Sequence, residues 1–141
     1  MTMSDHDALV SLHHRYADAV RAGAEAGADA WAGTWMPDAR WELPGRSMRG
    51  IDDILALWRG SMNKNHRVVQ LYNSATFDID GDSASGRVQL LELVAVADGS
   101  RTVLAGHYDD TYRRAADGWK FASRELTIYY RGAPDLTGTF S

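Results

Sequence analysis

Three Asp-Gly pairs, at residues 80–81, 98–99 and 117–118, separate four long runs that are rich in β-branched and aromatic residues. Asp-Gly between such runs is a strong signal for a hairpin, because these residues tolerate the positive φ angles of a tight turn. Three hairpins in series predict a four-stranded antiparallel meander without internal repeats. Its strands are expected at residues 68–79, 84–97, 102–113 and 119–130.

The first half of the chain shows helical spacing instead. Apolar side chains recur every three or four residues from 5 to 21, after Ser4, which can cap a helix. Shorter helices are expected over residues 29–35 and 51–60, with a short strand at residues 41–43. Helices that precede a long antiparallel sheet indicate the α+β class. Because a long sheet twists and curls, helices on its concave face would enclose a cone-shaped space suited to a small molecule.

Length and composition exclude several classes of function. The 141 residues suffice for one domain, expected to span 1–141 with a loosely ordered polar tail over 131–141. The absence of cysteine excludes disulfides and cysteine-ligated metal centres. A formal net charge of -4 argues against nucleic acid as a partner, and the longest apolar runs are too short to cross a membrane. The polar first residues are unlike a signal peptide, so we expect a cytoplasmic protein.

Six short motifs occur in an order and spacing that match a known family. They are Tyr16-Ala17-Asp18-Ala19, Trp35-Met36-Pro37-Asp38-Ala39-Arg40-Trp41, Gly50-Ile51, Asp80-Gly81-Asp82-Ser83-Ala84, Gly106-His107-Tyr108-Asp109-Asp110, and Asp117-Gly118-Trp119-Lys120-Phe121 with the nearby Arg124. Over residues 9–136 the chain resembles the SnoaL-like branch of the nuclear-transport-factor-2-like superfamily. In pattern it is most similar to scytalone dehydratase, hexachlorocyclohexane dehydrochlorinase and bile-acid dehydratase. The resemblance implies a cystatin-like α+β barrel, a cone-shaped curved antiparallel sheet packed with N-terminal helices, in a homodimer or homotrimer with a pocket that needs no cofactor.

The catalytic residues of those relatives are not all retained. In the dehydratase-type members, an Asp at the end of the first helix orients a His that acts as general base, and in some a Tyr assists. Motif spacing places these three positions at Ala24, Val69 and Ala19 in this chain. Val69 is found by counting back four residues from Asn73. Alanine and valine cannot transfer protons, so the chemistry of this chain is either different or absent.

Four residues are candidates for a catalytic role: His66, His107, Asp109 and Arg124. Arg124 matches a pocket arginine of some relatives, and it could bind an oxyanion or form a structural ion pair. His66 could reach the mouth of the pocket from the loop before its strand, or be solvated. His107 and Asp109 alternate on one strand face, as a base and its orienting carboxylate would, or as a polar pair on the outside of the sheet would. No third ligand at a suitable spacing accompanies them, so we expect no metal.

A second set of residues is expected to bind the substrate. Tyr16 lies on the inward stripe of the first helix, where it could hydrogen-bond a ligand oxygen or belong to the core. Some tryptophans could line the pocket against a flat ligand, although most are expected in the core. The set comprises Tyr16, Trp41, Trp58, Val69, Asn73, Leu126 and Ile128.

Two functions of different class remain open. The first is a cofactor-independent enzyme, a cyclase, isomerase or lyase, that acts on a hydrophobic cyclic or polyketide-like substrate in a central pocket. The missing Asp and His favour cyclisation or isomerisation, in which the shape of the pocket could hold a reactive conformer. The second is a non-catalytic module that binds a small molecule or supports assembly. Hydrolysis of an epoxide, with Asp109 or Glu125 beside Arg124, is a third hypothesis.

Overall fold

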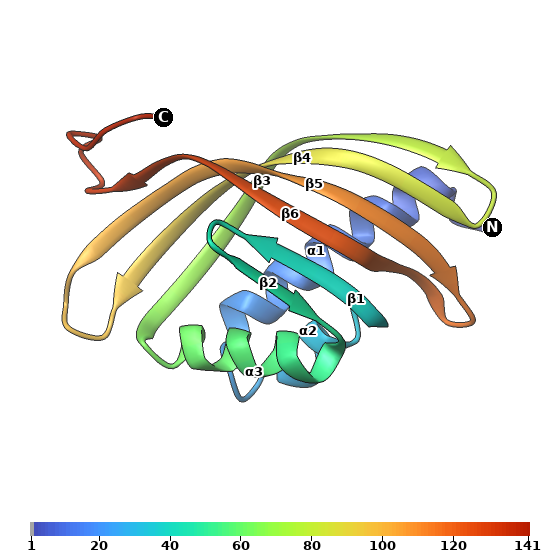
Figure 1. Cartoon of the computed structure of the whole chain (residues 1–141), viewed down its shortest axis with the longest axis horizontal. Coiled ribbons are helices and arrows are strands. Elements are labelled where there is room, and N and C mark those ends of the chain that lie inside the picture. The colour runs from blue at the N-terminus through green and yellow to red at the C-terminus, as the bar shows by residue number, and fades with distance from the viewer. Residues whose placement is uncertain (1) are drawn as a thin grey trace.

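The computed structural model describes residues 2–141, apart from the side chains of Asn73 and Ser74. Over those residues the chain forms three helices and six strands (Figure 1). The helices are α1 (Asp5–Ala22), α2 (Ala28–Ala32) and α3 (Ile51–Met62). The strands are β1 (Trp35–Leu43), β2 (Arg46–Arg49), β3 (Asn65–Asp80), β4 (Ser83–Val96), β5 (Arg101–Ala115) and β6 (Gly118–Gly132).

The strands form one sheet in the order β2-β1-β6-β5-β4-β3. Strands β3 to β6 are the predicted antiparallel meander, joined by turns at the three Asp-Gly pairs. β1 pairs with β2 in antiparallel and with β6 in parallel, so the sheet is mixed and not wholly antiparallel. The α+β class, with helices first and a curved sheet after them, is confirmed.

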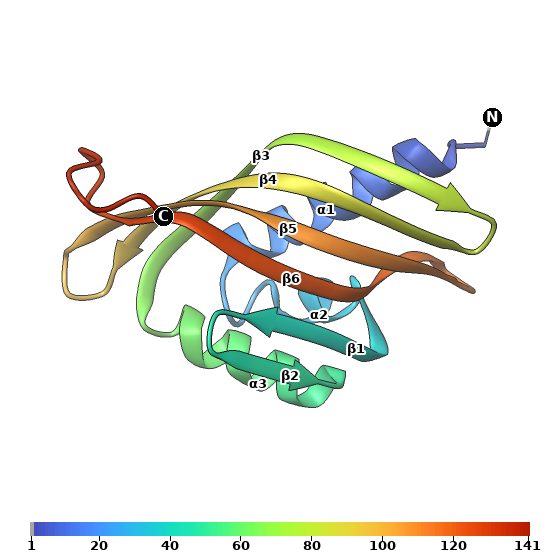
Figure 2. The same cartoon turned by 45° about the horizontal axis from the view of Figure 1, so that its top comes forward.

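The sheet arches over the helices, which lie on its concave side (Figures 1 and 2). Register shifts accompany the bend, between Tyr72 and Ala75 on β3 and between Ala105 and Gly106 on β5, as expected where bulges bend strands. Glycine is required at Gly106, because a Cβ there would lie 2.2 Å from a carbonyl oxygen of β6. The inner face of the sheet therefore faces the core, and helices leave the outer face uncovered.

Helix α1 covers much of the concave face. The hydroxyl of Ser4 accepts a hydrogen bond from the backbone N–H of Asp7 at 3.1 Å, which confirms the predicted cap. Asp5, in the first turn, accepts hydrogen bonds from Arg114 at 2.9 Å and from the Trp119 indole at 3.1 Å. These contacts fix the start of α1 to the turn between β5 and β6. The buried stripe of the helix consists of Leu9, Leu12, His13, Tyr16, Ala19 and Val20.

Aromatic rings fill the space between α2, α3 and β1. Trp31 stacks on Trp58 with ring centroids 4.5 Å apart and an interplanar angle of 8°. Trp35 and Trp41 pack against Trp31 at 5.5 and 5.6 Å. All five tryptophans are buried, in agreement with the expectation that most belong to the core. None of the helices formed by the described residues is long and apolar enough to cross a membrane.

Several element boundaries differ from the predicted ones. The helix expected over 29–35 ends earlier, where the Thr34 hydroxyl donates to the carbonyl of Trp31 at 2.6 Å, and β1 follows at once. Helix α3 continues through Gly60 to Met62, whose side chain is buried. Strand β2 was not predicted, because its four mostly exposed side chains give no alternation signal. Strand β6 also extends two residues into the segment expected to be a tail.

Candidate functional site

A cavity of about 430 Å³ opens between α3, the end of α1 and the concave face of the sheet. This volume lies within the roughly 300–1,000 Å³ that small-molecule sites occupy. Four of the residues predicted to bind substrate meet in its lining: Tyr16, Trp41, Trp58 and Leu126. The charged lining residues are Arg46, Lys64, Glu92 and Arg131.

Strand pairing places Gln70, Glu92, Leu104 and Arg131 in one row across this cavity, in which all but Leu104 are polar. Gln70 Nε2 donates to Glu92 Oε2 at 2.8 Å, and the hydroxyl of Tyr72 donates to Gln70 Oε1 at 3.1 Å. Burial raises the pKa of the Glu92 carboxyl, while the hydrogen bond from Gln70 and the charge of Arg131 act in the opposite direction. A cavity carboxyl group with a raised pKa is suited to acid–base catalysis.

Two tyrosines, Tyr16 and Tyr108, line the same cavity. The indole N–H of Trp41 donates to the Tyr108 hydroxyl at 3.2 Å, so the phenolic hydrogen of Tyr108 can be donated in turn to a ligand. Burial raises the pKa of both phenols. Both hydroxyls are therefore protonated at neutral pH and can act as hydrogen-bond donors.

Arg124 lies behind these tyrosines and is completely buried. Its Nε and Nη2 atoms donate to the two carboxylate oxygens of Asp110 at 2.7 and 3.2 Å. Its guanidinium carbon lies 3.8 Å from the centroid of the Tyr108 ring and 4.7 Å from that of Tyr16. The two tyrosines line the cavity and Arg124 does not, so of its two predicted roles the structure contains the structural ion pair, here with Asp110, from which the guanidinium supports the tyrosines.

About one turn nearer the start of α1 than Tyr16, His13 joins the same buried network. Its Nε2 atom lies 2.7 Å from the Tyr112 hydroxyl, which donates to Asp110 at 3.1 Å. Burial, together with the nearby charge of Arg124, lowers the pKa of His13 to about 2. The imidazole is therefore neutral at physiological pH, and the network is buried, with His13 Nδ1 and Arg124 Nη1 left without a hydrogen-bond partner among the described residues.

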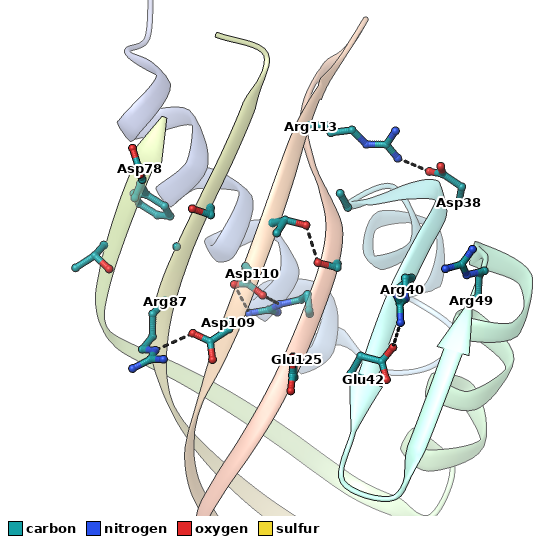
Figure 3. Close-up of a pocket in the computed structure, with 18 residues that line it drawn as sticks. Asp38, Arg40, Glu42, Arg49, Asp78, Arg87, Asp109, Asp110, Arg113 and Glu125 are labelled. Carbon is teal, nitrogen blue, oxygen red and sulfur yellow. Dashed lines mark hydrogen bonds and ion pairs between the residues drawn. The ribbon is translucent and has the colours of Figure 1, made fainter. Parts of the chain in front are cut away.

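A larger hollow of about 1000 Å³ lies on the outer face of the sheet (Figure 3). Most of its charged side chains point toward an opposite charge, as the figure shows. The pairs are Arg87 with Asp109 at 2.8 Å, Arg40 with Glu42 at 2.9 Å, and Arg113 with Asp38. Charges that neutralise one another in this way are typical of a solvated or contact surface and not of a reaction centre.

His107 and Asp109 both belong to this outer face. Strand alternation is the reason, because Tyr108 between them faces the cavity. His107 is hydrogen-bonded through Nδ1 to the hydroxyl of Tyr129, and its Nε2 lies 3.1 Å from Asp109. Of the two alternatives predicted for this pair, the structure contains the polar pair outside the sheet, and neither side chain lines the cavity.

A family model described as a SnoaL-like domain matches residues 1–125. The chain belongs to the SnoaL-like domain family. This finding confirms the resemblance that the six motifs indicated. No curated protein sequence matches the chain.

Solved structures share the fold of this SnoaL-like chain at low sequence identity. A candidate scytalone dehydratase from Novosphingobium aromaticivorans has a TM-score of 0.84 at 17% identity, covering 96% of this chain and 91% of its own. The Kfla4162 protein from Kribbella flavida has a TM-score of 0.81 at 24% identity, covering 91% and 93%. A hexachlorocyclohexane dehydrochlorinase, LinA-type3 from Novosphingobium barchaimii, has a TM-score of 0.74 at 18% identity, covering 97% of both chains. Because the identities are all below 25%, these likenesses show that the fold is shared.

Three other predicted site residues do not meet in the cavity, and a fourth cannot be placed there or elsewhere by its side chain. His66 is exposed and lines a separate hollow of about 270 Å³ at the end of α1. Val69 lies on the outer face, because its two neighbours in β3 face the cavity. Ile128 packs against the core without lining the cavity. The side chain of Asn73 lies outside the described residues.

Glu92 and Gln70 were not among the predicted site residues of this SnoaL-like chain. A signal for Glu92 is present, because alternation along β4 puts this carboxylate on the same face as the buried Leu90. No such local signal marks Gln70. Its contact with Glu92, 22 residues away, depends on the register between β3 and β4.

Proposed function

We propose that this SnoaL-like protein is a cofactor-independent enzyme that moves a proton on a hydrophobic cyclic molecule bound in the interior cavity. One observation carries the proposal: Glu92 places a carboxyl group of raised pKa in the wall of an apolar cavity, within reach of hydrogen-bond donors. Buried carboxyl groups are uncommon, and those with a raised pKa in a cleft are typical of active sites.

The reaction classes that fit are isomerisation and elimination. The Glu92 carboxylate removes a proton from a carbon of the substrate and becomes a carboxylic acid, while Gln70 holds one of its oxygens at 2.8 Å. The hydroxyls of Tyr108 and Tyr16 donate hydrogen bonds that stabilise the negative charge developing on a substrate oxygen or leaving group. In an isomerisation Glu92 returns the proton to another carbon. In an elimination the leaving group departs with its bonding electrons, and cyclisation through an enolate of a polyketide-like substrate would begin with the same proton transfer.

The structural neighbours support this proposal. A dehydrochlorinase eliminates hydrogen chloride, and hexachlorocyclohexane is an apolar ring. The resemblance placed the family's histidine on β3, where this chain has Val69 pointing outward. Glu92 would supply the base from β4 instead.

A second candidate is a non-catalytic binding module of the same fold. The alanine and valine at Ala24 and Val69 favour it, because these positions supply the catalytic Asp and His of the family. In that case Glu92 would select a ligand without transferring its proton.

Hydrogen exchange in D₂O tests the two candidates against each other. Cyclic ketones and cyclic β-hydroxyketones, each with and without a carboxylate group, and chlorinated cyclohexanes are incubated with the protein, and both product and recovered ligand are analysed by mass spectrometry. We expect product or deuterium incorporation with at least one of these compounds. Glu92→Gln is expected to lower the rate by about 10²–10⁴-fold, the usual contribution of an acid–base group.

Glu125→Gln is the matched control, because Glu125 is an exposed carboxylate of the outer face. We expect this variant to keep the wild-type rate. Compounds that bind without exchange or product would overturn the enzyme proposal in favour of the binding module. Equal rates in the wild type and in Glu92→Gln would overturn the role of Glu92.

We also propose that two copies of the chain associate through the outer face. Leu71, Leu91 and Leu93 are 39–50% exposed, and strand register places Leu71 beside Leu91. Arg87 and Asp109 lie on the same face and carry opposite charges. In a dimer with a twofold axis, Arg87 of each copy can lie opposite Asp109 of the other copy. Light scattering is expected to give twice the 15.6 kDa of the monomer, and Leu91→Asp is expected to give the monomer. A monomeric wild type would contradict this proposal.

A further inference from the structure

The rim of the interior cavity carries a charge opposite to that of the whole chain. The formal net charge of the protein is -4, yet the cavity is lined by three cationic side chains and one carboxylate. The cations come from three separate segments: Arg46 begins β2, Lys64 lies between α3 and β3, and Arg131 lies near the end of β6. The fold therefore gathers positive charge at this opening, whereas acidic residues dominate elsewhere.

These three cations differ from the surface arginines that form ion pairs, and they differ from other exposed arginines without an ion pair among the described residues, such as Arg59 and Arg101, because they line the interior cavity. Arg40, Arg87, Arg113 and Arg114 each form an ion pair with a carboxylate. Among the described residues, Arg46, Lys64 and Arg131 are exposed and none forms an ion pair. Unpaired charges of one sign around an apolar cleft focus the electric field there and attract an oppositely charged ligand.

The wall below the rim is apolar. Trp41, Trp58 and Leu126 line it, together with Val68 and Leu90. Such a wall favours a ring system over an extended polar chain. The cavity thus combines an apolar interior with a cationic opening. A ligand that fits both has an apolar ring and a negatively charged group.

We propose that the substrate is a cyclic hydrophobic acid, whose ring enters the cavity and whose carboxylate stays at the rim with Arg131, Lys64 and Arg46. This inference names the substrate class of the enzyme proposed above and rests on the same cavity. An ionised Glu92 repels an anionic substrate, and the three cations offset this repulsion.

Strand geometry sets the distance between the two ends of such a substrate. Glu92 and Arg131 flank Leu104 in one row, two strand spacings apart. Neighbouring strands lie about 4.8 Å apart, so the two backbones are separated by about 10 Å. A carboxylate held by Arg131 therefore directs an adjacent ring toward Glu92.

Two fluorescent probes test the inference without any turnover. The anion 8-anilinonaphthalene-1-sulfonate and the neutral N-phenyl-1-naphthylamine share a ring system and differ in the sulfonate. We expect the wild type to bind the anion about tenfold more tightly at low ionic strength. Arg131→Gln and Lys64→Gln should each weaken binding of the anion about 3–10-fold and leave binding of the neutral probe unchanged.

Two variants serve as controls for charge and for location. Arg59→Gln removes an exposed cation of α3 that does not line the cavity, and it should change neither affinity. Leu91→Asp disrupts the outer apolar face and should also leave both probes bound. Equal affinity for the two probes, an equal effect of Arg59→Gln, or loss of both probes in Leu91→Asp would each overturn the inference.

The outcomes also separate this inference from the proposed enzyme activity. Arg131-dependent binding of the anion without turnover of any compound would support the ligand class and refute catalysis. Turnover of neutral rings together with equal affinities for the two probes would support catalysis and refute the acidic substrate.

Discussion

The space between the sheet and the helices has a closed end and an open end, which hold polar side chains in opposite states. At the closed end, His13, Tyr112, Asp110 and Arg124 are buried and joined to one another by hydrogen bonds. At the open end, Glu92 is hydrogen-bonded to Gln70 but lines a cavity of about 430 Å³. Residue type is therefore a poor guide to function in this chain, because an Arg, an Asp and a His serve the core while a Glu serves the cavity.

The two ends are connected through Arg124. Its guanidinium is held by Asp110 and stacks on the rings of Tyr108 and Tyr16, which line the cavity. The closed network thus fixes the position of the hydrogen-bond donors at the open end. Three variants test this contrast, from the largest expected effect to the smallest.

Removing the counter-charge at the closed end is expected to have the largest effect. Asp110→Asn leaves the buried guanidinium of Arg124 uncompensated, so the free energy of unfolding should fall by about 3–5 kcal/mol. The adjacent Asp109→Asn is the control, since its side chain is 46% exposed and its loss should change stability by less than about 1 kcal/mol. Denaturant unfolding followed by tryptophan fluorescence measures both. Equal losses in the two variants would show that the buried pair has no special role.

The neutral His13 is expected to make the protein sensitive to acid. Its pKa of about 2 in the folded state lies far below the value of about 6.5 in the unfolded chain, so below pH 6.5 only the unfolded state gains the proton. The free energy of unfolding therefore decreases as the pH falls. Between pH 6 and 4, His13 alone contributes a loss of about 1.4 kcal/mol per pH unit. His13→Gln should lack that component. Parallel pH dependences in the two proteins would contradict a neutral, buried His13.

The smallest effect is expected at the open end, and it has the opposite sign. Because its pKa is raised on folding, Glu92 adds stability below the unfolded pKa of about 4.3, and this contribution is lost as the pH rises through the folded pKa. The Glu92→Gln variant should therefore be more stable than the wild type at pH 8. The expected gain in the free energy of unfolding is about 0.5 kcal/mol, the low end of the range typical of stabilising substitutions. The gain should vanish near pH 4. A destabilised variant at pH 8 would indicate a structural role.

The fold could be predicted well because its signals are local. Each Asp-Gly pair determines a turn from two adjacent residues, and Ser4 with the apolar stripe behind it determines α1. Strand β2 was missed, since its short exposed segment is stabilised by pairing with β1 and has no pattern of its own. The parallel contact of β1 with β6 was also missed, because it joins segments about eighty residues apart.

The site was harder to predict because it depends on which face each side chain takes. The position expected for the family's histidine was counted from Asn73, next to which the register of β3 shifts. Because successive side chains of a strand point to opposite faces of the sheet, Val69, His107 and Asp109 lie on the outer face. Glu92 acquires its role from Gln70 on the neighbouring strand and from the cavity itself, and neither is encoded in the residues around it.

The pairing of β1 with β6 has a consequence for synthesis on the ribosome. The hairpin of β1 and β2 emerges early, but β6, which contributes the next strand of the sheet, is the last to be made. Until it emerges, Trp35 and Trp41 lack the strand beside them, and the emerging chain exposes apolar surface of the kind that chaperones bind. Folding cannot proceed from the N-terminus in independent pieces, and the cavity, which needs Leu126 and Arg131, is completed only when the final strand arrives.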